Sequence, residues 1–170
     1  MSGFIFVRNR QATRKIDPSC LRTILSNLLE DELDHPEYEI GVLLVARPEM
    51  AKINETYLHH KGSTDVITFD YGDPVLLNWL VGDIFICVQE AVNQARTFGT
   101  TWQAEVVRYL VHGVLHLCGY DDRAPGQTKR MKQEEDRIVT RLSCQFDFNK
   151  LSKTTRRSTR KENPASNRRR

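Results

Sequence analysis

The chain has 170 residues, of which 39% are hydrophobic, and this is enough apolar side chain for one domain with a substantial core. No stretch approaches the ~18–20 consecutive apolar residues that cross a bilayer. The N-terminal apolar run also precedes its basic residues, the reverse of a secretory signal, so we expect a cytoplasmic protein without membrane segments. The net charge of +3 hides an asymmetry, because residues 150–170 contain nine Lys/Arg and one Glu, which leaves residues 1–149 with a net charge of −5.

Apolar runs and helical periodicity predict the elements in chain order: a strand at 4–9, a helix at 17–34, a strand at 39–46, a helix at 48–58, strands at 64–71 and 81–88, and helices at 88–99, 101–118 and 127–142. Asp17 and Pro18 are typical of a helix start, and Thr100 with Gln103 fits a capping box. The four cysteines form no CxxC pair and are expected to be reduced thiols. This order predicts one α+β domain over residues 1–150, with a small mixed sheet of about four strands packed against helices.

The C-terminal segment 151–170 is basic and lacks apolar periodicity, so we expect a disordered tail. Two interpretations stay open for it. It is either a solubilising extension or an arm that binds nucleic acid through its phosphates, with release of counterions.

The stretch HGVLHLCGYDD, residues 112–122, has the residue types and spacing of a metal site. On a helix, His112 and His116 lie one turn apart on the same face, so both imidazoles can bind one cation. Gly119 ends the helix and lets the chain turn back, so Asp121 or Asp122 can supply a carboxylate oxygen. Three protein ligands leave a fourth position for water, which is typical of catalytic zinc sites.

The alternative is that both histidines are ordinary hydrogen-bonded side chains, but the helix around them is otherwise apolar and offers them few polar partners. A zinc-peptidase helix carries a glutamate base directly after the first histidine, and here that position is Gly113. A glycine cannot accept a proton, so the peptidase interpretation is disfavoured and the general base stays unassigned.

These residues resemble the signature of the YbeY-type endoribonucleases, His-Gly-x-Leu-His-Leu-x-Gly-Tyr-Asp-His, almost position for position. The resemblance extends upstream to TDVITF (64–69) and VGDIFIC (81–87), spans roughly residues 38–142, and leaves the basic tail uncovered. It implies a zincin-like fold and one zinc ion held by three side chains. It also implies hydrolysis of single-stranded RNA during late maturation of ribosomal RNA, at the 16S 3′ end.

Two positions depart from the family pattern. Asp122 stands where the common signature has histidine, and a ligand set of His112, His116 and Asp122 leaves a zinc site with charge +1 rather than +2, which acidifies bound water less. Many relatives carry an arginine where this chain has Leu58, and His60 and Lys61 in the following loop are the candidate RNA contacts.

Glu105 lies two helical turns before His112, so it is either a hydrogen-bond partner of a ligating histidine or a surface acid. The sequence therefore predicts a metal-dependent endoribonuclease whose partners are a ribosomal RNA precursor and the small ribosomal subunit. Two alternatives stay open: a non-catalytic ribosome-assembly factor with a structural zinc, and a metal-dependent hydrolase of another substrate.

Overall fold

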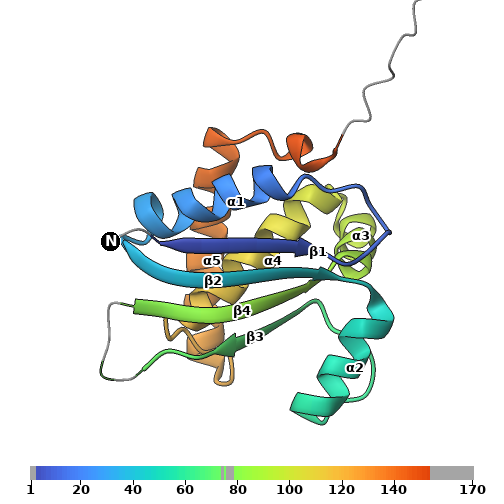
Figure 1. Cartoon of the computed structure of the whole chain (residues 1–170), viewed down its shortest axis with the longest axis horizontal. Coiled ribbons are helices and arrows are strands. Elements are labelled where there is room, and N and C mark those ends of the chain that lie inside the picture. The colour runs from blue at the N-terminus through green and yellow to red at the C-terminus, as the bar shows by residue number, and fades with distance from the viewer. Residues whose placement is uncertain (1–2, 74, 76–78, 154–170) are drawn as a thin grey trace, which may run out of the picture.

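The protein is built around one four-stranded sheet, and the computed structural model describes residues 3–73, 75 and 79–153. The strand order is β1-β2-β4-β3 (Figure 1). Strands β1 (Phe4–Asn9), β2 (Glu37–Val45) and β4 (Trp79–Cys87) are parallel, whereas β3 (Val66–Asp70) runs antiparallel to β4 at one edge. This mixed sheet confirms the predicted α+β class and the predicted strand number.

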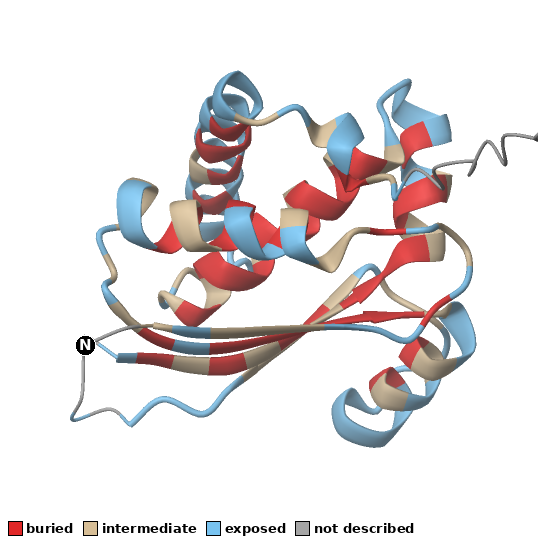
Figure 2. Ribbon diagram, turned by 45° about the horizontal axis from the view of Figure 1, so that its top comes forward, coloured by how far each residue is buried: buried red, intermediate tan, exposed pale blue. Residues whose placement is uncertain are grey.

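Helices cover the two faces of the sheet unequally (Figure 2). The main core lies on the face that packs against α1 (Pro18–Asn27), α3 (Val88–Phe98), α4 (Trp102–Leu117) and α5 (Pro125–Gln145), and α2 (Arg47–Leu58) packs on the opposite face. Because successive side chains of a strand point to opposite faces, Val42 and Leu44 join the main core, while Leu43 and Val45 pack with Met50 of α2.

Helix α4 is the central helix of the main core, because eleven of its sixteen residues are buried. Its N-cap is Thr101, whose hydroxyl accepts a hydrogen bond from the backbone N–H of Ala104, and not the predicted Thr100. The side chain of Thr100 is engaged elsewhere, since it donates to the carboxylate of Glu105.

The first predicted helix, 17–34, divides into two parts. Asp17 caps it as predicted, accepting from the backbone N–H of Ser19, and the α-helix runs to Asn27. A π-helical turn, η1 (Leu28–Glu32), then follows and keeps Leu28 and Leu29 buried. Asp34, with φ of 55°, takes a left-handed conformation that separates this turn from β2.

Other predicted boundaries shift by a few residues for local reasons. Strand β3 starts at Val66 rather than residue 64, because the carboxylate of Asp65 accepts from the Val66 backbone N–H. Strand β4 starts at Trp79 rather than residue 81, since the first residues of β2 pair with it there. Helix α5 spans Pro125–Gln145 and exceeds the predicted 127–142 at both ends.

The packed chain continues past residue 150. A short 3-10 turn, η2 (Phe148–Leu151), places Leu151 fully inside the main core, and Ser152 forms a β-bridge with Ile16. The rest of the expected disordered tail, residues 154–170, lies outside the described residues. Within the described ranges, no helix is both long and apolar enough to cross a membrane.

Candidate metal centre

Three donor atoms from α4 and the loop after it converge on one point. The Nε2 atoms of His112 and His116 lie 3.1 Å apart, and Asp122 Oδ2 lies 3.8 Å from the first and 3.6 Å from the second. Two ligands of a tetrahedral zinc ion, each ~2.0–2.1 Å from the metal, are about 3.3 Å apart. Among the described residues, this is the one group of three His, Cys, Asp or Glu side chains with such spacing.

The hydrogen bonds of the two imidazoles favour a cation between them. His112 Nδ1 lies 3.0 Å from Glu135 Oε2, and His116 Nδ1 lies 3.0 Å from the backbone carbonyl oxygen of Tyr120. Both partners are acceptors, so each Nδ1 carries the proton and each Nε2 presents a lone pair. Two lone pairs that face each other at 3.1 Å repel unless a positive charge lies between them, and this donor set therefore fits a metal ion.

Glu135 of α5 is the buried acid that orients His112. It is 5% exposed, and besides His112 it accepts from Arg108 Nη1 at 2.7 Å and from Lys132 Nζ at 3.1 Å. Burial by itself would raise the pKa of this carboxyl, but the hydrogen bonds from His112, Arg108 and Lys132 lower it to about 2. Glu135 therefore stays ionised and holds the imidazole with a charge-assisted hydrogen bond.

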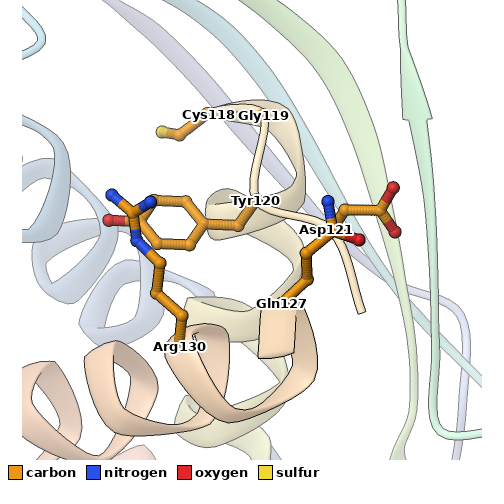
Figure 3. A pocket seen from close by; sticks show the side chains of 6 residues that line it. All are labelled: Cys118, Gly119, Tyr120, Asp121, Gln127 and Arg130. Atoms are coloured by element: carbon orange, nitrogen blue, oxygen red, sulfur yellow. The ribbon is translucent and has the colours of Figure 1, made fainter. Parts of the chain in front are cut away.

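The loop after α4 determines which aspartate faces the histidines. Gly119, with φ of 87°, supplies the left-handed residue that reverses the chain. Asp121 then accepts three hydrogen bonds from the Arg123 side chain, and its carboxylate points away from Tyr120 and Arg130 (Figure 3). Of the two candidate aspartates, it is Asp122 whose carboxylate reaches the imidazoles.

A small cavity of roughly 240 Å³ lies beside this loop, lined by Cys118, Gly119, Tyr120, Asp121, Gln127 and Arg130 (Figure 3). The Arg130 guanidinium stacks over the Tyr120 ring at 5.8 Å from its centroid. Burial raises the pKa of the Cys118 thiol to about 11, so this sulfur stays protonated and does not compete as a metal ligand. The cavity includes none of the three converging side chains.

Gly113 is a packing residue. A β-carbon at this position would lie 2.6 Å from the Ile84 side chain and 3.2 Å from Thr68 Oγ1, so the glycine allows α4 to lie directly on β3 and β4. Position 113 points into the sheet. A glutamate there would clash with the sheet and would not reach the two imidazoles, which removes the peptidase type of base.

Comparison with known proteins establishes the family. Residues 6–143 match the family described as Endoribonuclease YbeY. The chain belongs to this family. Curated proteins of that name include one from Parabacteroides distasonis, which is 36% identical over 61% of this chain and 71% of the relative. Another, from Syntrophotalea carbinolica, is 33% identical over 85% of this chain and 99% of the relative. A third, from Chlorobium luteolum, is 33% identical over 76% of this chain and 91% of the relative.

A solved structure shares the fold. The solution structure of TM1509 from Thermotoga maritima is 23% identical and gives a TM-score of 0.59, with 84% of this chain and 91% of that chain covered. At this identity the likeness concerns the fold alone. The zincin-like label therefore stays a prediction, whereas membership of the YbeY family rests on the sequence match.

In this YbeY-family chain, the other predicted site residues lie apart from the three donor atoms. Glu105 is 4% exposed and accepts from Thr100 at 2.6 Å, so it is no surface acid, and the imidazole of His112 is held by Glu135 instead. His60 and Lys61 are exposed in the loop after α2, and neither lines the cavity beside His112.

Sequence reasoning missed Glu135. It lies 23 positions after His112, and no local spacing rule links two residues at that separation. A weak signal existed, because Met131, Glu135, Ile138 and Leu142 share one helical face with apolar residues on either side of the acid. An acid in the apolar stripe of a helix needs a buried partner, and here the partner is a candidate metal ligand.

Proposed function

We propose that this YbeY-family chain is a zinc-dependent endoribonuclease that cleaves single-stranded RNA and acts in late maturation of ribosomal RNA, at the 16S 3′ end. The observation that carries the proposal is the convergence of His112 Nε2, His116 Nε2 and Asp122 Oδ2 in a chain whose residues 6–143 match the family. Family membership supports RNA as the substrate. The donor atoms support a metal as the source of the chemistry.

His112, His116 and Asp122 would hold one zinc ion, since two imidazoles and a carboxylate are a common zinc ligand set. When bound, zinc supplies Lewis-acid chemistry, either by polarising a phosphoryl oxygen or by lowering the pKa of a water molecule. Glu135 and the Tyr120 carbonyl hold the two Nδ1–H groups, so that both Nε2 lone pairs stay aimed at the same point. The carboxylate of Asp122 lowers the total charge of the loaded site to +1.

The site is open to a polymer substrate. The side chains of His112 and His116 are 26% and 29% exposed, and that of Asp122 is 45% exposed. An RNA strand can therefore reach the centre without opening of the core. The ribosomal RNA precursor and the small subunit are the proposed partners, and the cytoplasm is the proposed location because ribosome maturation takes place there in bacteria.

One set of measurements separates this function from its two alternatives. The full chain is purified, its metal content is measured, and single-stranded and structured RNAs are incubated with it beside His116→Ala. Metal-dependent cleavage of single strands that disappears in the variant supports the endoribonuclease. Tight binding of RNA or of small subunits without cleavage would instead indicate a non-catalytic assembly factor, and neither activity would indicate another substrate.

A further inference from the structure

A second cavity adjoins the metal centre on the other side of His112. It has a volume of roughly 450 Å³, within the ~300–1,000 Å³ typical of small-molecule sites. Its lining comes from α3, the loop between α3 and α4, α4, α5 and Asp65 before β3, and it includes Phe98, Glu105, Tyr109 and His112. Because His112 is part of its wall, a group bound here lies next to the candidate zinc site.

Two deeply buried polar side chains line this cavity with atoms that lack a protein partner. Tyr109 is 5% exposed, and across the described ranges its hydroxyl makes no hydrogen bond. Glu105 is 4% exposed. Within those same ranges its carboxylate accepts one hydrogen bond, which the Thr100 hydroxyl donates to Oε1. Among the described residues, the fully buried side-chain atoms without a partner are Asn27 Oδ1 and Thr68 Oγ1, so the Tyr109 hydroxyl and the second Glu105 oxygen are exposed to the space of the cavity, where a ligand can complete their hydrogen bonds.

The charges divide the cavity into two ends. At the metal end, Arg108 and Lys132 are already paired with Glu135 and Asp136 at 2.6–3.2 Å. At the far end, Asp65 and Glu105 form no ion pair within the described part of the chain. Asp65, Glu105 and Tyr109 line the same cavity, and burial, followed by the negative charges of these two acids, raises the pKa of Tyr109, so the tyrosine stays a neutral hydroxyl. A phosphate is repelled from this end.

An exposed aromatic ring also lines this cavity. Phe98, the last residue of α3, is 67% exposed although it is large and apolar. An exposed ring beside a mainly apolar cavity is a platform on which a nucleobase can stack, and single-stranded RNA is commonly recognised by bases that are unstacked and held in this way. The carboxylates of Glu105 and Asp65 accept hydrogen bonds, so the preferred base is one that donates them.

We propose that this cavity binds one unstacked base of the RNA beside the cleavage site, and that it prefers a base with an exocyclic amino group over its keto counterpart. The amino group donates to the free carboxylate oxygen of Glu105, and the neighbouring ring nitrogen accepts from the Tyr109 hydroxyl. Cytosine and adenine offer this pair of groups in this order, whereas uracil and hypoxanthine offer the reverse order, with a carbonyl oxygen toward the carboxylate and a ring N–H toward the hydroxyl. The inference rests on the proposed function and adds base selectivity to it.

The test compares matched bases in otherwise identical RNA. The zinc-loaded full chain is given single-stranded oligonucleotides in which each position around the cleaved bond carries cytosine or uracil, or adenine or hypoxanthine. A hydrogen bond to a charged group changes affinity by roughly tenfold, so we expect a five- to twentyfold preference for the amino base at one position. Glu105→Gln and Tyr109→Phe should reduce this preference to about twofold or less.

Matched controls are available outside the cavity. Tyr38→Phe removes another buried tyrosine hydroxyl, one that donates to Glu30, and Glu49→Gln neutralises an acid on α2 that pairs with Arg10. Both should keep the wild-type preference. Equal cleavage of amino and keto substrates by the wild type, or an unchanged preference in both folded cavity variants, would overturn the proposal.

A binding measurement separates this proposal from the endoribonuclease activity. Cytidine and uridine 5′-monophosphates are titrated into the wild type and Glu105→Gln while the ring resonances of Phe98 and Tyr109 are followed by NMR. Tighter binding of the cytidine nucleotide, lost in the variant, supports the base site even if no RNA is cleaved. Equal binding or no binding at these rings contradicts the base site even if RNA is cleaved.

Discussion

Replacing Glu135 by glutamine tests whether the buried acid of α5 controls the metal centre. The substitution keeps the shape of the side chain and removes the negative charge that His112 Nδ1 meets at 3.0 Å. The amide oxygen can still accept one hydrogen bond, so the change is from a charge-assisted bond of about 1.5–3 kcal/mol to a neutral one of about 0.5–1.5 kcal/mol. A difference of about 1.4 kcal/mol weakens zinc binding roughly tenfold, at the lower end of the ~10–100-fold expected for such partners.

The assay is a competition titration of zinc between the protein and a chromophoric chelator, with wild type, Glu135→Gln and Glu134→Gln measured in parallel. Glu134 is the neighbouring acid, but it pairs with Arg137 at 2.6 Å and lies apart from His112, so its variant should match the wild type. Thermal unfolding in excess chelator checks that all three apo proteins are folded. A zinc Kd for Glu135→Gln within twofold of the wild-type value would refute the role assigned to this carboxylate.

Three further outcomes are expected. Asp122→Ala should lose most of its bound zinc at equal free metal, because two imidazoles alone hold zinc weakly; undiminished zinc by elemental analysis would exclude Asp122 as a ligand. Gly113→Ala should lower the free energy of unfolding by about 1–3 kcal/mol, since its β-carbon would lie 2.6 Å from Ile84, and an unchanged denaturation midpoint would contradict this. Deleting residues 154–170, which spares the buried Leu151, should weaken RNA binding and flatten its salt dependence; an equal slope would show that the tail does not bind phosphates.

Local patterns predicted the elements well and their ends less well. The strand 4–9 has the predicted bounds, because its apolar run begins directly after Gly3 and is followed by a polar stretch that starts at Arg8. The start of β4 was predicted two residues late, since strand length depends on pairing with β2 and no sequence window contains both strands. The helix cap was assigned to Thr100 because Gln103 follows it by three residues, as in a capping box, whereas Thr101 caps the helix and the side chain of Thr100 is taken by Glu105.

The candidate site also contains residues that a local sequence pattern reveals and residues that only tertiary packing brings together. His112 and His116 are visible in the sequence because helical geometry alone brings residues four apart onto one face. Asp122 was favoured over Asp121 on family resemblance, and the structure adds a physical reason, since Arg123 engages the other carboxylate. Glu135 and the role of Glu105 depend on how α5 and α3 pack against α4, which no local pattern contains.

The metal centre therefore depends on packing that begins far from it in the sequence. Helix α5 brings Glu135 to His112, and α5 is itself held by Glu32 of η1, a carboxylate whose side chain is 1% exposed. Glu32 accepts from Arg141 Nε at 2.9 Å and lies 3.9 Å from an Arg137 nitrogen, and these arginines follow Glu135 on α5 by six and two residues. The orientation of a histidine ligand depends on its hydrogen-bond partner. The direction of His112 Nε2 therefore depends on Glu135, and through α5 on the contacts of Glu32 in the N-terminal half of the chain. This is a physical reason for the metal-binding helix, η1 and α5 to form one folded unit.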